Sequence, residues 1–329
     1  MRSYWIQQTG SETAGSQTAL ELRETPVPEP AAGQVLLRVR AAGLNRGEFI
    51  AGHGLLKPGA AKPAGTEGAG EVAKLGAGVT GLAVGERVMG RCAGAFAEYA
   101  LMDAREAIPV PKRLTWQEAA AVPLVFMVVH DMLIGQGRLK AGEWLLVTGI
   151  SSGVGVGSLQ AAKALGAKVI GTSGSGEKLA RLAPLGLDVA IRTRAPDFCG
   201  AVMQATGGRG ADLAVNTVGG SVFAECVRAL AFEGRLAIVG YVDGQLKAEM
   251  DLEALHAKRL RLFGVSNKLR NAEQRAATVR GFAADLLPAI ADGRIKPLVD
   301  RVFPFAELPQ AKALMESNAH TGKIVVSLP

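Results

Sequence analysis

The sequence predicts a mixed α/β protein with two domains, one built on a doubly wound parallel sheet and the other rich in β-strands. At 329 residues the chain exceeds the usual size of a single domain. From residue 141 onward, short apolar runs alternate with helix patterns for about 125 residues, which is the rhythm of β-α-β units. Before that point, partly alternating runs are separated by glycine and proline clusters, and they indicate strands rather than long helices.

The β-rich domain is expected over residues 1–122. Val35–Arg40 and Gly70–Leu75 alternate in part between apolar and polar residues, as half-buried strands do. Another strand follows a glycine-rich turn within residues 81–90. The pattern changes near Thr115, which is placed to cap a helix that begins directly after it.

The C-terminal part of the chain is expected to return to this first domain. A helix pattern covers Ala272–Ala291, and Gly293 and Pro297 follow it. Strand character then appears in Lys323–Leu328. Because this tail is too short to form a domain alone, we expect residues 267–329 to complete the β-rich domain.

The second domain is expected over residues 123–266 as a doubly wound parallel sheet of six strands. Its first strand is a continuous apolar run, as expected for a central strand that is buried on both faces. The strands are expected at Trp144–Thr148, Lys168–Thr172, Asp188–Ile191, Asp212–Thr217, Arg235–Val239 and Arg261–Val265. With the intervening helices they form the architecture of a dinucleotide-binding domain.

A glycine-rich turn joins the first of these strands to its helix. Gly149, Gly153 and Gly155 follow the spacing G-x-x-x-G-x-G, which differs from the usual G-x-G-x-x-G and is weak evidence alone. Its position between strand and helix strengthens it, because such a turn exposes N–H groups at the positive end of the helix dipole. We expect a pyrophosphate to bind at Ser152, Gly153 and Val154; a turn with small residues for packing alone is the alternative.

The end of the second strand predicts which coenzyme is bound. It holds Thr172, Ser173 and Ser175 where an acidic residue would hold the ribose hydroxyls of NAD. Lys178 follows, and the one nearby acid, Glu177, suits the first turn of a helix. A carboxylate would repel a 2′-phosphate, whereas hydroxyls and an ammonium accept it. NADPH is therefore the expected coenzyme, with Ser173 and Lys178 at its 2′-phosphate.

The composition argues against several classes of protein. Cys92, Cys199 and Cys226 lie far apart, which argues against a disulfide framework or structural zinc and favours the cytoplasm. The net charge of +7 is spread along the chain, so no nucleic-acid partner is expected. The first residues lack an apolar signal core. The longest apolar run, Ala119–Val129, is interrupted by Pro123 and is too short to cross a bilayer, so no membrane association is expected.

Taken together, these features resemble the medium-chain dehydrogenase/reductase superfamily, specifically its zinc-free quinone oxidoreductase branch. The resemblance covers nearly the whole chain and rests on Ala41–Arg46, Gly65–Val72, Gly81–Gly90, the Ser151–Gly155 turn with Gln160 and Lys163, and Thr321–Val326. It implies a GroES-like catalytic domain beside a Rossmann domain, a homodimer, and hydride transfer from NADPH to a small-molecule quinone. An enoyl or 2-alkenal double-bond reductase and a non-catalytic NADPH-binding redox sensor are the alternatives.

The resemblance also bears on zinc. Zinc-dependent members carry a G-H-E signature whose histidine binds the metal, and here the sequence reads Gly65-Thr66-Glu67. Their cysteine ligand falls near Leu44 and Asn45, where no thiol exists. Without a Lewis acid an alcohol is hard to oxidise, whereas a quinone or an α,β-unsaturated carbonyl can be reduced without a metal. No metal site and no alcohol dehydrogenase activity are expected.

The resemblance implies three candidate catalytic residues. Asn45 is expected to point at the nicotinamide and the substrate, with a loop asparagine that caps a turn as the alternative. Thr66 is expected to line the same cleft. His53 could supply a proton or contact substrate, although a lone loop histidine is more often a surface residue. Val128 stands where many relatives have a threonine that supports the nicotinamide.

The remaining coenzyme contacts are implied at the carboxyl ends of the later strands, where ligands bind in this architecture. Arg192 is expected as a phosphate partner because its planar fork suits that anion, with a solvated arginine as the alternative. Asn216 and Val218 are expected near the adenine and ribose. The residues expected beside the nicotinamide are Gly240, Tyr241, Phe263 and Val265.

Overall fold

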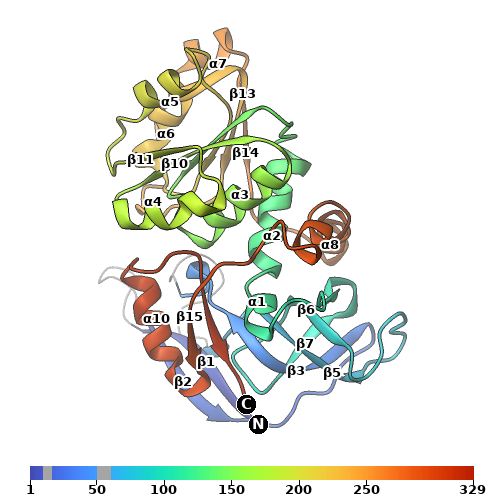
Figure 1. Ribbon diagram of the computed structural model, residues 1–329. Helices are drawn as coiled ribbons and strands as arrows, with labels where there is room; N and C mark the ends of the chain where they lie inside the picture. The colour runs from blue at the N-terminus through green and yellow to red at the C-terminus, as the bar shows by residue number, and fades with distance from the viewer. Residues whose placement is uncertain (10–16, 50–60) are drawn as a thin grey trace. The chain divides into compact units, whose positions relative to one another are not determined.

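The computed structural model describes residues 1–9, 17–49 and 61–329, which form two compact units (Figure 1). Unit 1 comprises Met1–Leu124, Asn271–Ala283 and Pro297–Pro329, within the described ranges. Unit 2 comprises Val125–Arg270 and Ala284–Lys296. In the described part of the chain, no helix is long and apolar enough to cross a membrane.

Unit 2 is built on the predicted six-stranded parallel sheet, with helices packed around it (Figure 1). The strands are β9 (Trp144–Thr148), β10 (Lys168–Ser173), β11 (Val189–Arg192), β12 (Ala211–Asn216), β13 (Leu230–Ile238) and β14 (Arg261–Gly264). Their order is β11-β10-β9-β12-β13-β14, and neighbouring strands run parallel. The strand order therefore reverses between β9 and β12, and in open α/β sheets ligands bind beside such a point.

The helices of unit 2 cover this sheet. They are α3 (Gly153–Ala164), α4 (Gly176–Leu182), α5 (Cys199–Ala205), α6 (Phe223–Ala229), α7 (Leu252–Ala257) and α9 (Leu287–Ala291), and α2 (Pro123–His130) carries the chain from unit 1 into unit 2. Every residue of β9 is buried, which accounts for its continuous apolar run. Phe198, Val202 and Cys226 belong to the same buried apolar cluster as Leu146 and Leu236 of the sheet, so α5 and α6 pack there.

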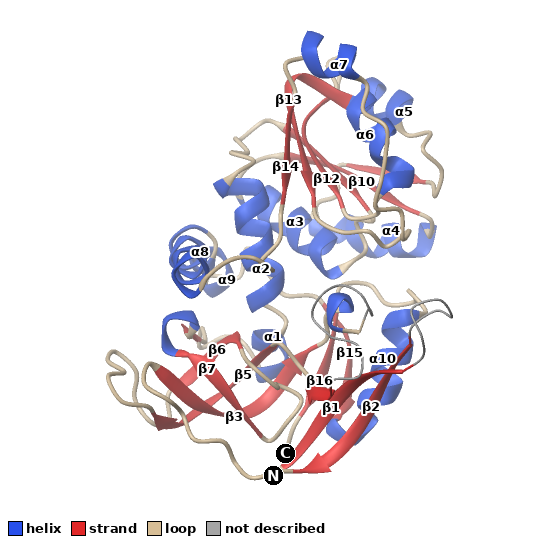
Figure 2. Cartoon of the chain, turned by 180° about the vertical axis from the view of Figure 1, so that it is seen from behind, coloured by secondary structure: helices blue, strands red, loops and turns tan. Residues whose placement is uncertain are grey.

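Unit 1 consists mainly of strands (Figure 2). They are β1 (Arg2–Thr9), β2 (Gln17–Glu24), β3 (Gln34–Gly43), β4 (Ala61–Pro63), β5 (Glu67–Leu75), β6 (Arg87–Arg91), β7 (Tyr99–Asp103), β8 (Ile108–Pro109), β15 (Val299–Pro304) and β16 (Lys323–Ser327). Seven of them form a sheet in the order β15-β16-β3-β5-β6-β8 with β7 paired to β3, and β2-β1-β4 form a smaller sheet. Because β16 pairs with β3, the C-terminal strand lies in the middle of the larger sheet.

Helices α1 (Trp116–Ala120) and α10 (Leu308–Glu316) also belong to unit 1. Thr115 caps α1 as predicted, since its hydroxyl accepts a hydrogen bond from the backbone N–H of Glu118. The Glu118 side chain bonds back to the backbone N–H of Thr115, which completes a capping box. Leu308, Ala311 and Met315 of α10 pack in the buried core of the unit.

The single helix predicted over Ala272–Ala291 is wrong. The structure has two helices, α8 (Ala272–Asp285) and α9, which begins at Leu287. Pro288 is the physical reason, because it lacks an amide hydrogen and its ring clashes with the carbonyl oxygen four residues earlier. The sequence contained this signal.

The chain also changes unit at this break. Ala284–Lys296 groups with unit 2, although the sequence analysis assigned all of 267–329 to the β-rich domain. The Nε2 atom of His130 lies 2.7 Å from an Asp285 carboxylate oxygen. The backbone N–H of Lys296 donates to Gln160 Oε1 over 2.7 Å. These contacts connect the short segment to the helices of unit 2.

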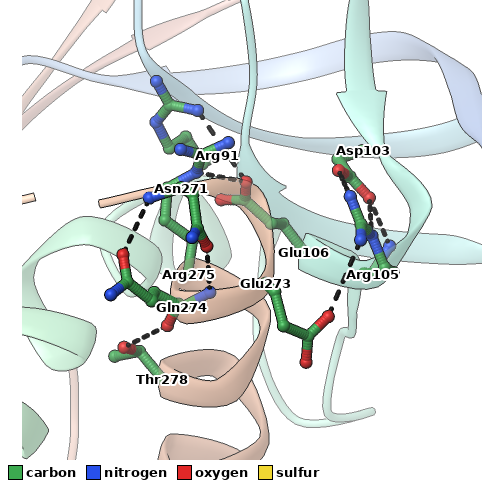
Figure 3. A network of polar contacts seen from close by, with 9 residues as sticks. All are labelled: Arg91, Asp103, Arg105, Glu106, Asn271, Glu273, Gln274, Arg275 and Thr278. Carbon is green, nitrogen blue, oxygen red and sulfur yellow. Dashed lines mark hydrogen bonds and ion pairs between the residues drawn. The ribbon is translucent and has the colours of Figure 1, made fainter. Parts of the chain in front are cut away.

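A polar network attaches α8 to unit 1 (Figure 3). Asn271 begins the helix by exchanging hydrogen bonds with Gln274, so that each side chain accepts from the other residue's backbone N–H. One turn further on, Arg275 Nε donates to Glu106 Oε1 over 2.7 Å. Arg91 approaches the same oxygen to 3.8 Å. Glu106 is only 2% exposed, and a buried charge of this kind requires such partners.

Candidate functional site

The glycines of the β9–α3 turn allow the backbone to fold tightly. Gly149 has φ of 64°, and a Cβ atom added there would lie 2.6 Å from Thr217 Oγ1. A Cβ atom at Gly155 would collide with the backbone oxygen of Ile150. A side chain at either position would therefore displace the turn. This is the physical reason for glycine at these two sites.

The three residues predicted for the pyrophosphate lie at the start of α3. Ser152 is the N-cap, and its hydroxyl accepts a hydrogen bond from Gly155 N over 3.1 Å. Gly153 and Val154 are the first two residues of the helix and are half-buried. Their backbone N–H groups belong to the positive end of the helix dipole, which suits an anion.

The β10–α4 turn brings the predicted 2′-phosphate residues to one edge of the sheet. Ser173 ends β10 and is in register with Arg192, which ends β11. The Ser173 hydroxyl accepts a hydrogen bond from Ser175 N over 3.3 Å. Ser175 in turn caps α4 by accepting from the backbone N–H of Lys178 over 3.3 Å. Lys178 therefore lies in the first turn of the helix that follows Ser173.

A second arginine, which sequence reasoning did not select, lies against this turn. A Cβ atom added at Gly174 would collide with Nε of Arg194. A Cβ atom added at Gly176 would lie 3.6 Å from Cδ of Arg192. Two exposed arginines therefore lie beside the turn that ends β10. The signal was present in the sequence as the second arginine of Arg192-Thr193-Arg194.

Asn216 has an internal role that the sequence did not indicate. Its Oδ1 atom accepts hydrogen bonds from the backbone N–H groups of Val218 and Gly219, both over 3.0 Å. Its Nδ2 atom donates to the backbone oxygen of Gly219 over 2.8 Å. Asn216 thus shapes the turn after β12, where Val218 lies beside Gly149. Direct contact of Asn216 and Val218 with a coenzyme stays a prediction.

Two threonines that sequence reasoning missed connect β9 to β12 at the reversal of strand order. Thr217 Oγ1 donates to the backbone oxygen of Thr148 over 2.7 Å. Thr217 N donates to Thr148 Oγ1 over 3.2 Å. These bonds fix the carboxyl ends of two neighbouring strands, next to the glycine-rich turn.

The four residues predicted beside the nicotinamide lie at the carboxyl ends of β13 and β14. Gly240 and Tyr241 follow β13, and the Tyr241 side chain is exposed. Phe263 lies in β14 and Val265 follows it, with its N–H donating to Ile238 O over 3.0 Å. The structure therefore brings them to the strand ends that the prediction requires. Their contact with a nicotinamide ring stays a prediction.

Unit 1 contains a buried polar cluster formed by Asn45, Glu48, Thr66, Glu67 and Lys323. Lys323 begins β16, and its ammonium donates to Glu67 Oε1 over 2.6 Å and to Asn45 Oδ1 over 2.9 Å. Glu67 begins β5 and is completely buried. Its other carboxylate oxygen accepts a hydrogen bond from a backbone N–H over 2.8 Å. The cluster therefore contains a fully desolvated ion pair.

Asn45 connects the two carboxylates of this cluster. Its Nδ2 atom donates to Glu48 Oε1 over 3.0 Å and to Glu67 Oε1 over 2.9 Å. Because Oδ1 accepts from Lys323, both ends of the amide are used inside unit 1. The structure thus brings Asn45 and Thr66 together, as two of the predicted catalytic residues. The third, His53, lies outside the described residues.

Glu48 is the member of the cluster that sequence reasoning missed. Its Oε1 atom accepts hydrogen bonds from Asn45 and from the Thr66 hydroxyl. Its Oε2 atom is buried and has no hydrogen-bond partner in the described part of the chain. Burial raises the pKa of Glu48 to about 7, and the charge of Glu67 raises it further, whereas the two hydrogen bonds and the Lys323 charge oppose this rise.

Two protein-family models match the chain, one in each unit's sequence. The model for a zinc-binding dehydrogenase matches residues 153–279, and that for an alcohol dehydrogenase GroES-like domain matches 31–112. Fold and site together define a two-unit α/β protein with a doubly wound sheet and a GroES-like unit. The chain belongs to the medium-chain dehydrogenase/reductase superfamily, as the resemblance predicted.

A curated relative is similar over almost the whole chain. One of the proteins that make up the phenolphthiocerol/phthiocerol polyketide synthase of Mycobacterium tuberculosis is 32% identical over 317 residues. The match covers 96% of this chain and 14% of that protein. The chain therefore spans only a small part of the length of this relative.

Three solved structures are similar over both units. A mycobacterial protein complexed with NADPH is 27% identical, with a TM-score of 0.87 and coverage of 99% of this chain and 100% of that one. A mycobacterial quinone oxidoreductase is 28% identical, with a TM-score of 0.84 and coverage of 99% of each chain. The CurK enoyl reductase is 26% identical, with the same TM-score of 0.84 and coverage of 99% of each chain.

The residues of the buried polar cluster do not fit the zinc ion that one family description implies. Zinc in proteins is held by cysteine, histidine and carboxylate ligands. Here the Lys323 ammonium already takes oxygens from Leu44, Asn45 and Glu67, and its charge would repel a divalent cation. Nearby Cys92 is buried, and burial raises the pKa of its thiol, which keeps it protonated. No group of three or more potential metal ligands exists among the described residues.

Proposed function

We propose that the chain is an NADPH-dependent reductase that transfers a hydride to a quinone without a metal ion. The observation that carries this proposal is the turn after β10. It joins the hydroxyls of Ser173 and Ser175 to the first turn of α4, and Arg192 and Arg194 lie against it. No carboxylate ends β10, so this edge favours the phosphorylated coenzyme over NAD.

Each group of residues has a role in this proposal. Ser152, Gly153 and Val154 hold the pyrophosphate, and Ser173, Lys178, Arg192 and Arg194 hold the 2′-phosphate. Val218, Gly240, Tyr241, Phe263 and Val265 contact the nucleosides, in a strand-end region that Asn216 shapes. The coenzyme supplies the hydride when bound. Asn45 and Thr66, within the buried polar cluster, lie beside the substrate.

The acceptor has two candidates. A quinone is supported by the similarity to a mycobacterial quinone oxidoreductase. An enoyl or 2-alkenal acceptor is supported by the similarity to the CurK enoyl reductase and to a polyketide synthase. Steady-state assays with NADPH and a panel of both acceptors will separate them by kcat/KM. Tight NADPH binding without oxidation by any acceptor would instead favour a redox sensor.

Two further expectations belong to this proposal. We expect a homodimer, because β14 is an edge strand of the unit 2 sheet and can be extended by a second copy. We also expect a reducing compartment, most simply the cytoplasm. Cys92, Cys199 and Cys226 are all free thiols, which agrees with that expectation.

Replacing Lys178 with alanine is expected to weaken NADPH binding by roughly 10- to 100-fold, the equivalent of one lost charge-assisted hydrogen bond. NADH, which lacks the 2′-phosphate, should bind with an almost unchanged Kd. Fluorescence titration with both coenzymes measures this difference. Lys168→Ala is the matched control, because Lys168 lies at the opposite end of β10. An equal loss for NADPH and NADH would remove Lys178 from the phosphate site.

The proposal also predicts that zinc is not needed. The purified protein should contain no stoichiometric zinc by elemental analysis, and dialysis against a chelator should leave its activity unchanged. The reason is that the Lys323 ammonium already neutralises Glu67. One zinc ion per chain, with activity that disappears on its removal, would contradict this prediction.

A further inference from the structure

We infer that Glu48 stores the proton that completes the reduction and passes it to the substrate through the Thr66 hydroxyl. This inference rests on the proposed function, because it requires the anion that hydride transfer leaves on the acceptor. Thr66 is then the catalytic residue, since it touches substrate. Glu48 is a positioning residue that acts through it.

The geometry of Glu48 is that of a buried acid with one free oxygen. Glu48 is 7% exposed, whereas Thr66 is only half-buried. The Thr66 hydroxyl contacts Glu48 Oε1, which also accepts from Asn45 over 3.0 Å. Within the described residues, Oε2 is buried without a hydrogen-bond partner. A neutral carboxyl group suits this setting better than a carboxylate, whose second oxygen would lose its solvation without compensation.

Charges on three neighbouring strands surround Glu48. Glu67 of β5 carries the like charge, and Lys323 of β16 carries the opposite charge next to it. Lys62 of β4 also interacts with Glu48, whose charge counteracts the lowering of the Lys62 pKa by burial. Because burial outweighs these charges, the pKa of Glu48 is raised to about 7. An acid near the working pH is suited both to give a proton and to regain it.

The proposed step balances in protons and electrons. NADPH gives two electrons and one proton as a hydride, which leaves an anion on a quinone oxygen. The Thr66 O–H bond breaks as the substrate O–H bond forms, and the Glu48 O–H bond breaks as the Thr66 hydroxyl is restored. The resulting Glu48 carboxylate accepts hydrogen bonds from Asn45 and Thr66, and water returns the proton before the next turnover. With an enoyl acceptor the proton goes to the α-carbon instead.

The test is the pH dependence of kcat for NADPH and a quinone from about pH 5.5 to about pH 9. In the wild type, kcat should fall as the pH rises through about 7, because the acid is lost. Glu48→Gln should lower kcat by about 100-fold at the acid end and remove this fall, while the Kd for NADPH changes less than about twofold. Thr66→Val should behave in the same way, and Thr66→Ser should restore activity. Glu307→Gln, at an exposed site of unit 1, is the control.

Infrared difference spectra of the wild-type protein provide a readout that does not depend on turnover. The carbonyl band of a neutral carboxyl group should disappear as the pH rises through about 7 and should be missing in Glu48→Gln. An active wild type whose Glu48→Gln variant keeps both kcat and its pH limb overturns the relay alone, as does a missing neutral carboxyl band. A wild type that binds NADPH but reduces no acceptor overturns the proposed function, and the relay with it.

Discussion

Lys323→Met is expected to lower the free energy of unfolding by about 3–5 kcal/mol, one of the largest effects of any single substitution in this chain. The substitution keeps the length of the side chain but removes its ammonium. Glu67, which is completely buried, would then be left as a carboxylate without a counter-ion. Asn45 would lose the donor to its Oδ1 atom at the same time. Urea denaturation, with the slope compared between variants, measures the loss.

Two comparisons make the Lys323 result interpretable. Lys312→Met removes a surface ion pair to Glu316 on α10 and should cost about 0.5 kcal/mol or less. The double variant Lys323→Met with Glu67→Gln removes both charges, and it should recover much of the stability that the single variant loses. If Lys323→Met were as stable as the wild type, the buried ion pair would not be a major determinant of the stability of unit 1.

The doubly wound sheet could be predicted because its signal is local. Each strand buried on both faces gives a continuous apolar run, and β9 was predicted with its observed bounds. β13 was predicted to begin at Arg235, but it begins at Leu230. Glu233 has φ of 57°, and Gly234 follows it, so this strand contains an irregularity that resembles a turn in the sequence. The helix break at Pro288, by contrast, was predictable and was overlooked.

The two candidate sites differ in how far the sequence could define them. The coenzyme turns depend on contiguous residues, so Ser152 and Ser173 could be selected from their place after a strand. The buried polar cluster depends on pairing between distant segments, since Glu67 and Lys323 are 256 positions apart. The contact of Glu48 with Thr66 likewise depends on how β3 and β5 pair. No local pattern in the sequence reports such a contact.

The pH dependence of stability should also change strongly in Glu48→Gln. The folded protein holds the Glu48 proton up to about pH 7, whereas the ordinary pKa of a glutamate is 4.5. Below pH 4.5 both states are protonated, and Glu48 carries no penalty. As the pH rises from there through 7, the unfolded state gives up this proton first, so the wild type loses stability relative to the variant.

Over this window the stability difference between Glu48→Gln and the wild type should move by about 3 kcal/mol in favour of the variant, and it should level off above it. A glutamine does not titrate, and it still offers an oxygen to Asn45 and Thr66 at the Oε1 position. Urea unfolding at a series of pH values measures the difference, and the exposed Glu307→Gln should show none of this trend. A difference that stays constant with pH would mean that Glu48 is ionised at neutral pH. Because unfolding reports on Glu48 without any coenzyme or acceptor, it tests the proton store independently of catalysis.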